Sequence, residues 1–213
     1  MRIRWHGHAC FEIAGSTVVV TDPHDGKSLG IPAPDVRADI VLVSHQHTDH
    51  NCDEVVRGDD CTVIKDPLMT FEKGVRVEGI EASHDDHGGA KRGAVTLFKF
   101  DMDGVKFCHL GDLGHIPDDD QTARIDDVDF LFVPVGDVYT IGPVAAKMII
   151  DKVRPKVAIP MHYRVPGLSL SIKPVGEFTR LFDDAVIVNV GNEVDFSSED
   201  MPSGPTEIWV FSK

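Results

Sequence analysis

The sequence predicts a layered α/β domain in which two β-sheets pack face to face and helices cover their outer faces. Two observations favour this fold class. Many short apolar segments are separated by Gly, Pro and Asp, as in strand-rich chains, and only a few segments have helical spacing. No linker, repeat or low-complexity tract divides the 213 residues, so we expect a single domain over residues 1–213.

The expected strands are short runs of apolar and β-branched residues bounded by turn-forming residues. The clearest pair flanks Asp103-Gly104, a dipeptide typical of two-residue hairpins. In order along the chain, the expected strands are residues 3–5, 10–13, 17–21, 40–43, 62–64, 75–82, 94–102, 105–109, 130–133, 157–159, 186–190 and 207–211.

Helices are expected at three places. Residues 142–153 have apolar residues at helical spacing and end just before Pro155. Residues 173–182 carry Pro174, which suits the first turn of a helix, and residues 49–57 form a shorter candidate.

The composition excludes some classes of function. Acidic residues number 35 and basic residues 21, and the resulting net charge of −14 repels phosphate backbones and argues against nucleic-acid binding. No run approaches the roughly 18 to 20 apolar residues of a membrane span, and the N-terminus lacks the apolar core of a signal peptide. We therefore expect a cytoplasmic protein that does not contact membranes. The sequence leaves open whether the protein forms a homo-oligomer.

The eleven histidines cluster where apolar strands give way to loops. Directly after the strand at 40–43 come His45, His47, Asp49 and His50. Side chains two apart in extended backbone point the same way, so His45 and His47 can bind one ion. Asp49 and His50 can face a neighbouring ion once the chain turns. Imidazole nitrogen and carboxylate oxygen suit zinc and similar metals, so the segment predicts a metal site.

Four ligands in one loop cannot complete two coordination spheres, so further ligands must come from elsewhere. His84, Asp112 and His162 each follow an expected strand, as His45 does, and we predict that they are ligands. His84 is preferred to His87 because it lies nearer the end of its strand, where the sheet still fixes the backbone.

The whole pattern resembles the metallo-β-lactamase superfamily, whose H-x-H-x-D-H motif is seen here as His45, His47, Asp49 and His50. Further matching segments are Thr21-Asp22-Pro23, Gly111-Asp112, Trp5-His6-Gly7-His8-Ala9-Cys10-Phe11 and Pro160-Met161-His162-Tyr163. Within the superfamily, the chain is similar to the branch of small hydrolases that includes L-ascorbate-6-phosphate lactonase. Asn51-Cys52 stand where related enzymes often have two glycines, which weakens the analogy to the lactamases proper and the RNA-processing nucleases.

The resemblance implies a four-layer αββα sandwich with the site at one edge. It assigns His45, His47 and His84 to a first metal, and Asp49, His50 and His162 to a second. Asp112 would bridge the two ions, and Asp22 would orient the loop and the ligands through hydrogen bonds. The expected cofactor is two divalent ions, with Zn favoured and Mn, Ni or Fe as alternatives.

The predicted reaction is hydrolysis of a lactone, ester or phosphodiester bond in a small molecule by a hydroxide that bridges the metals. Asp49 would orient this hydroxide, and His115, three residues after Asp112, is a candidate proton donor. Lys91 and Arg92 are candidate substrate contacts and would favour an anionic substrate. The alternative for their loop is a mobile surface segment with solvated charges.

Two other functions remain open on this fold. One is a mononuclear iron oxidoreductase of the dioxygenase type, and the other is a metal-binding member without catalytic turnover. The sequence assigns no role to His6, His8, His24 or His87, and it does not identify the substrate.

Overall fold

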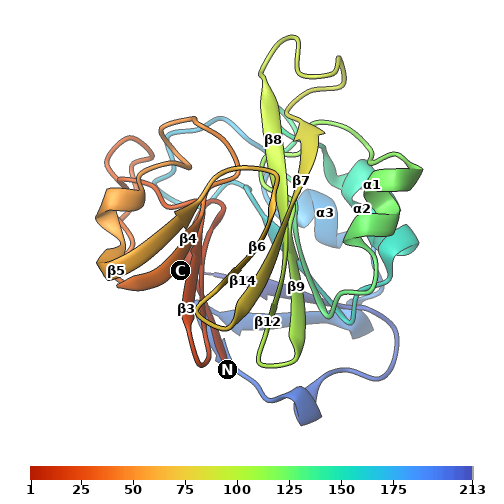
Figure 1. The fold of residues 1–213 in the computed structure, drawn as a ribbon. Helices are drawn as coiled ribbons and strands as arrows, with labels where there is room; N and C mark the ends of the chain where they lie inside the picture. The colour runs from red at the N-terminus through yellow and green to blue at the C-terminus, as the bar shows by residue number, and fades with distance from the viewer. Residues whose placement is uncertain (213) are drawn as a thin grey trace.

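Two mixed β-sheets pack face to face in the computed structural model, which describes residues 1–212 (Figure 1). One sheet has six strands in the order β13-β1-β2-β3-β4-β5, and the other has eight in the order β12-β14-β11-β10-β9-β8-β7-β6. The predicted fold class is therefore confirmed.

The six-stranded sheet contains the first five strands of the chain and one late addition. β1, β2 and β3 are antiparallel neighbours, while β4 and β5 run parallel to β3. The strands are β1 (Arg2–Gly7), β2 (Cys10–Ala14), β3 (Val18–Thr21), β4 (Ala38–Leu42), β5 (Arg57–Ile64) and β13 (Glu193–Asp195).

The eight-stranded sheet is antiparallel from β6 to β9 and parallel from β9 to β12. Asp103 and Gly104 both have positive φ and form the expected hairpin between β8 and β9. The strands are β6 (Met69–Glu72), β7 (Val75–Ser83), β8 (Ala94–Met102), β9 (Val105–His109), β10 (Phe130–Pro134), β11 (Val157–Met161), β12 (Ile187–Gly191) and β14 (Glu207–Phe211).

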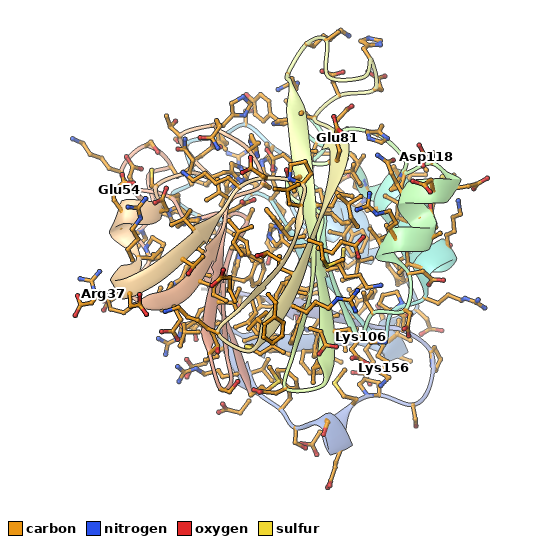
Figure 2. All side chains as sticks on the ribbon, viewed as in Figure 1. Arg37, Glu54, Glu81, Lys106, Asp118 and Lys156 are labelled. Carbon is orange, nitrogen blue, oxygen red and sulfur yellow. The ribbon has the colours of Figure 1, made fainter. Side chains whose placement is uncertain are left out.

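The main core fills the space between the two sheets. Phe11 of β2 crosses this space, and its ring lies 4.7 Å from that of Phe132 in β10 and 5.8 Å from that of Phe211 in β14. All three side chains are buried. Charged side chains such as those labelled in Figure 2 lie on the outside of the molecule, so the acidic excess is largely a solvated surface.

The helices α1 (Asp119–Ile125), α2 (Pro143–Val153) and α3 (Gly176–Thr179) lie beside the eight-stranded sheet (Figure 1). α2 confirms the helix expected at 142–153, and it ends at Arg154, whose left-handed backbone precedes Pro155. The outer face of the six-stranded sheet is covered by a smaller apolar cluster that includes Val56, beside the 3₁₀ turn η1 (Asp53–Val55).

Two expected helices differ from the structure. The one at 173–182 is reduced to the single turn of α3. The one at 49–57 is replaced by turns and η1, because the Cys52 amide donates to the carbonyl of Pro23 and β5 begins at Arg57 to pair with β4. The short 3₁₀ turns η2 (Asp184–Val186) and η3 (Ser198–Asp200) complete the chain.

The helix α1 was not expected, although its sequence carries a start signal. The Asp118 carboxylate accepts a hydrogen bond from the Gln121 backbone amide, and the Gln121 side-chain oxygen accepts one from the Asp118 backbone amide. This capping box is readable as an acid and a glutamine three residues apart. Within residues 1–212, no helix has the length and apolarity needed to cross a membrane.

Candidate metal centre

Polar loops gather at one edge of the molecule, where strands from both sheets end. β3 and β4 are parallel, as are β9, β10 and β11, so their carboxyl ends meet on the same side. The strand ends at this edge deliver His8, Asp22, Ser44, His45, His84, Asp112 and His162. Three of these residues, His8, Asp22 and His162, have positive φ, a strained backbone that is common at functional sites.

Asp112 lies at the centre of this edge and is 2% exposed. Its Oδ2 atom is 3.3 Å from His84 Nε2, and 3.4 Å from the Nε2 atoms of both His50 and His162. His45 Nε2 is 3.8 Å away. Burial opposes ionisation of Asp112, but the surrounding imidazoles outweigh it and hold its pKa well below the usual range. One carboxylate oxygen therefore lies within 3.8 Å of four histidines, which come from three separate segments of the chain: the loop after β4, the end of β7 and the end of β11.

His45, His47 and His84 form the first histidine group, in which the donor atoms all lie within 4.8 Å of one another. The ring centroids are 4.6 to 5.0 Å apart. His45 and His84 are buried, whereas His47 is exposed. Burial lowers the pKa of His45 to about 3, so its ring is neutral and can offer a lone pair.

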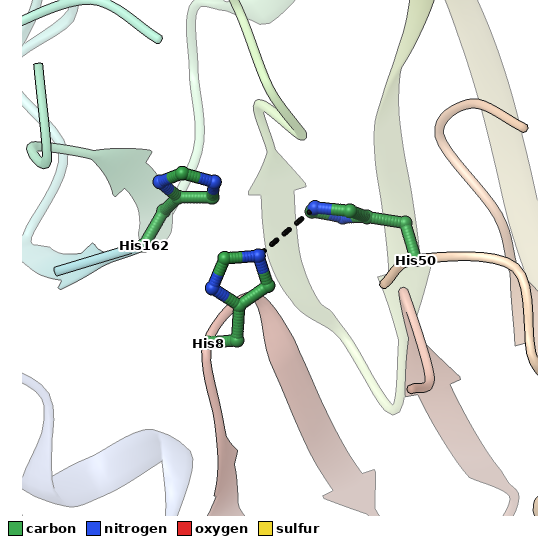
Figure 3. A group of neighbouring side chains, drawn as sticks. All are labelled: His8, His50 and His162. Carbon is green, nitrogen blue, oxygen red and sulfur yellow. Dashed lines mark hydrogen bonds between the residues drawn. The ribbon is translucent and has the colours of Figure 1, made fainter. Parts of the chain in front are cut away.

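His8, His50 and His162 form the second histidine group, again with donor atoms within 4.8 Å of one another (Figure 3). The rings of His8 and His50 point toward one another, and their Nε2 atoms are 3.2 Å apart. Asp49 Oδ2 is 3.2 Å from His8 Nε2 and 3.7 Å from His50 Nε2. The structure thus places Asp49, His50 and His162 around one point, together with His8, and their binding of a second metal stays a prediction.

Asp22 is fully buried beneath these groups and fixes their geometry. Its carboxylate accepts hydrogen bonds from the amide and the hydroxyl of Ser44, both at 2.7 Å, and from His50 Nδ1 at 3.0 Å. This contact fixes the orientation of the His50 ring, whose Nε2 atom lies 3.4 Å from Asp112 Oδ2. Burial disfavours a charged His50 ring, but Asp112 and Asp22 outweigh this and raise its pKa. Such carboxylate–histidine pairs orient metal ligands.

The arrangement suits a metal ion. His45 Nε2 and Asp112 Oδ1 are buried and have no hydrogen-bond partner within residues 1–212. Buried polar atoms are normally satisfied, so these two indicate that a cation belongs there. The donors are imidazole nitrogens and carboxylate oxygens, the set that zinc and other borderline metals prefer.

A cavity of about 310 Å³ opens beside the two groups, which is large enough for a small molecule. Arg92 reaches its wall, with the guanidinium 4.9 Å from the centre of the Tyr139 ring and hydrogen-bonded to the carbonyl of Val138. Arg92 also lines an adjacent cavity that contains Lys65. Lys91 is exposed and lines neither cavity. The lining residues are His47, Asp49, His84, Arg92, Asp112, Tyr139, His162 and Leu170.

The loop that carries Arg92 is held by Asp85. Its carboxylate accepts hydrogen bonds of 2.7 to 3.0 Å from the amides of His87, Gly89, Lys91 and Arg92. Burial opposes ionisation of Asp85, but these four N–H groups lower its pKa to about 2. The loop therefore has an ordered internal structure, in contrast to the alternative of a mobile surface segment.

Of the three histidines His84, His87 and His115, the structure places only His84 among the residues that line the cavity. His84 is 1% exposed and faces Asp112, whereas the His87 side chain is 49% exposed and its nearest charged partner is Asp86. His115 Nε2 accepts from the Ser83 amide at 3.2 Å, and its Nδ1 lies 3.0 Å from the carbonyl of Ile116. With both nitrogens engaged by backbone, His115 lacks the geometry expected of a proton donor to the cavity.

Known proteins match this chain over most of its length. Residues 2–162 match the family described as β-lactamase superfamily domain. A metal-dependent hydrolase of Archaeoglobus fulgidus is 31% identical over 194 residues, which cover 76% of this chain and 83% of that protein. A metal-dependent hydrolase of Thermoplasma acidophilum is 30% identical over 187 residues, with the same shares covered.

A solved structure shows a similar fold along the whole chain. It is that of a candidate Zn-dependent hydrolase of the metallo-β-lactamase superfamily from Thermotoga maritima, with a TM-score of 0.80, 37% identity and 99% of each chain covered. The superfamily predicted from the motifs is confirmed, while the likeness to L-ascorbate-6-phosphate lactonase stays a prediction. The chain belongs to the metallo-β-lactamase superfamily and, within it, to the metal-dependent hydrolases.

Proposed function

We propose that this protein hydrolyses a lactone, ester or phosphodiester bond in a small anionic molecule, at a centre of two divalent metal ions. The observation that carries the proposal is the position of Asp112, whose Oδ2 atom lies within 3.3 to 3.8 Å of histidine nitrogens from both groups. A carboxylate placed in this way can serve two neighbouring ions at once. The names of the relatives favour hydrolysis over an iron oxidoreductase or a non-catalytic protein.

The proposed ligands follow from the two groups. His45, His47 and His84 would hold one ion, and Asp49, His50 and His162 the other, with Asp112 shared. Zn is the proposed metal, and Mn, Ni or Fe are alternatives with the same kind of donor set. When bound, such ions lower the pKa of water toward neutrality and polarise the bond to be cleaved.

Asp49 has a second proposed task, which is to orient the attacking water. Its side chain lines the cavity and remains 24% exposed, unlike the buried His50 and His162 that share its proposed ion. Burial raises its pKa, but His8 and His50 outweigh this and lower the pKa, so the carboxylate is ionised. An ionised carboxylate at the cavity wall can accept a hydrogen bond from water and direct its lone pair at the substrate.

Arg92 is the proposed anion-binding residue. Its guanidinium lines the cavity together with the metal ligands, and its place is set by Asp85, Val138 and Tyr139. An arginine fork binds phosphate or carboxylate in a bidentate manner. Tyr139 and Leu170 line the same cavity and can contact an apolar part of the substrate. Lys91, which lines neither cavity, is left out of this proposal.

The test is a screen of metal-loaded protein against lactones, carboxylic esters and phosphodiesters, each in neutral and anionic forms. Anionic substrates should be preferred. Arg92→Gln should raise KM for them by about tenfold or more while the metal content stays unchanged, since a charge-assisted hydrogen bond contributes about 1.5–3 kcal/mol. Lys91→Gln is the matched control and should leave KM unchanged. Equal hydrolysis of neutral substrates, unaffected by Arg92→Gln, would contradict the anion-binding role.

A further inference from the structure

His8 is not among the proposed metal ligands, yet its ring lies beside three of them, Asp49, His50 and His162. It occupies the turn between β1 and β2 and is fully buried. We infer that His8 Nε2 is an additional ligand of the second metal position, beside Asp49, His50 and His162. This inference rests on the proposed metal centre and adds a residue that the H-x-H-x-D-H pattern does not contain.

Three distances carry the inference. His8 Nε2 is 3.2 Å from His50 Nε2 and 3.2 Å from Asp49 Oδ2, and these last two atoms are 3.7 Å apart. A circle through the three atoms has a radius of about 2.0 Å, close to the roughly 2.0–2.2 Å at which zinc binds nitrogen and oxygen ligands. One ion near the centre of this triangle would therefore reach all three donors without any movement of the chain.

A hydrogen bond from His8 to Asp49 is the competing explanation. A charge-assisted N–H···O bond is normally about 2.7–2.9 Å long, shorter than the 3.2 Å seen here. In addition, His8 Nε2 is equally far from His50 Nε2, and one N–H cannot point at both atoms. His50 uses its Nδ1 atom to donate a hydrogen bond to Asp22, so Nε2 is the ring nitrogen that faces His8 and can bind a metal ion. A metal ion at this point would bind all three atoms at once, which one proton cannot do.

The turn that carries His8 is held firmly enough to position a ligand. The His8 carbonyl accepts hydrogen bonds from the amide of His162 and from the Trp5 indole, both at 3.1 Å. The Trp5 ring in turn lies 5.1 Å from that of Tyr163. His8 is thus tied to the backbone of one proposed ligand while its ring faces another, as ligands held by rigid surroundings require.

Two variants distinguish a role of His8 as a metal ligand from a role as a hydrogen-bond donor. His8→Gln keeps an N–H group at similar reach but lacks the imidazole lone pair, and His8→Leu removes both. His6→Gln is the control, since His6 lies two residues earlier and contacts Glu12. Zinc affinity is measured by chelator competition and cobalt coordination by visible absorption, with thermal unfolding of the metal-free proteins to check folding.

If His8 is a ligand, both His8 variants should bind the second equivalent far more than 100-fold more weakly, beyond the roughly 10- to 100-fold effect of losing an outer contact, while the first equivalent is retained. His6→Gln should match the unchanged protein. A His8→Gln variant that binds both equivalents within threefold of the unchanged protein overturns the inference. If the unchanged protein binds no second equivalent, the proposed two-metal centre itself is wrong.

Zinc-soaked crystals of the unchanged protein give a test that does not depend on how the variants fold. The anomalous signal should place the second ion within about 2.4 Å of His8 Nε2, a small margin beyond ordinary zinc–nitrogen lengths. An ion held by His50 and His162 but more than about 3 Å from His8 Nε2 would show that His8 is not a ligand.

Discussion

Gly136 offers a way to displace one proposed ligand without altering any metal-binding side chain. It lies two residues past β10, where the backbone passes directly beside His162. A Cβ atom at this position would lie 2.0 Å from the His162 carbonyl oxygen and 3.2 Å from His162 Nδ1. Only glycine permits this approach, so Gly136→Ala must push the two segments apart.

The expected displacement is larger than a metal site tolerates. Real Cβ contacts are at least 3.0 Å, so the carbonyl of His162 must recede by about 1.0 Å, the difference between 3.0 and 2.0 Å. A ligand has to be held within about 0.5 Å of its working position. The second metal position should therefore lose its affinity, whereas the first should keep it. Overpacking of this kind costs roughly 1–3 kcal/mol in stability.

Two measurements check this expectation: the metal content of the protein after dialysis, and its thermal unfolding. Gly136→Ala should retain about one equivalent where the unchanged protein retains two. Gly114→Ala is the mirror test, since its Cβ would lie 2.2 Å from the backbone carbon of His84 and should disturb the first position instead. Gly176→Ala, with no atom within 4 Å of the added Cβ, is the neutral control. Two tightly bound equivalents and full turnover in Gly136→Ala would refute the reasoning.

Three further predictions follow from the same geometry. Asp112→Ala should lower turnover far more than 100-fold and release metal, measured by kinetics and metal analysis, and activity within threefold would exclude a bridging role. His84→Ala should lose one equivalent of metal and His87→Ala none, and the reverse result in metal titrations would show that the loop delivers the ligand. The pKa of Asp85, about 2, lies below its ordinary value of about 3.9, so its hold on the loop is complete above pH 4 and is lost as the pH falls toward 2. The protection factor of the Arg92 amide in hydrogen exchange, which is corrected for the intrinsic pH dependence of exchange, should therefore fall over that range. Asp85→Asn should lower the same protection factor at neutral pH, and unchanged protection in both cases would argue against this anchor.

Much of the fold was readable from local patterns. The Asp103-Gly104 turn predicted the β8–β9 hairpin, and the apolar spacing up to Pro155 predicted α2, because both signals lie within a few neighbouring residues. β6 and β13 were missed. They are short edge or near-edge strands whose pairing depends on partners elsewhere in the chain.

The convergence of His45 and His84 on one edge was predictable because each follows a strand, which fixes the direction of the next side chain, while their role as metal ligands stays a prediction. His8 could not be assigned, since its contact with His50 joins residues 42 positions apart. The choice between Lys91 and Arg92 depends on how Asp85 folds the loop, which spacing does not reveal. The cytoplasmic location, the single domain and the oligomeric state stay predictions.

The two histidine groups differ in burial, and this difference sets the direction from which substrate can approach. His8, His50 and His162 are at most 1% exposed, so the second position opens to the cavity mainly through Asp49. His47, in contrast, is exposed and lines both cavities with Arg92. An anionic group bound to Arg92 therefore places the rest of the molecule over His47 and Asp49, the two proposed ligands that solvent can reach. We therefore expect substrate to approach from the side of His47 and Asp49, one proposed ligand of each ion, while the buried His8 and His50 help to hold the second ion in place.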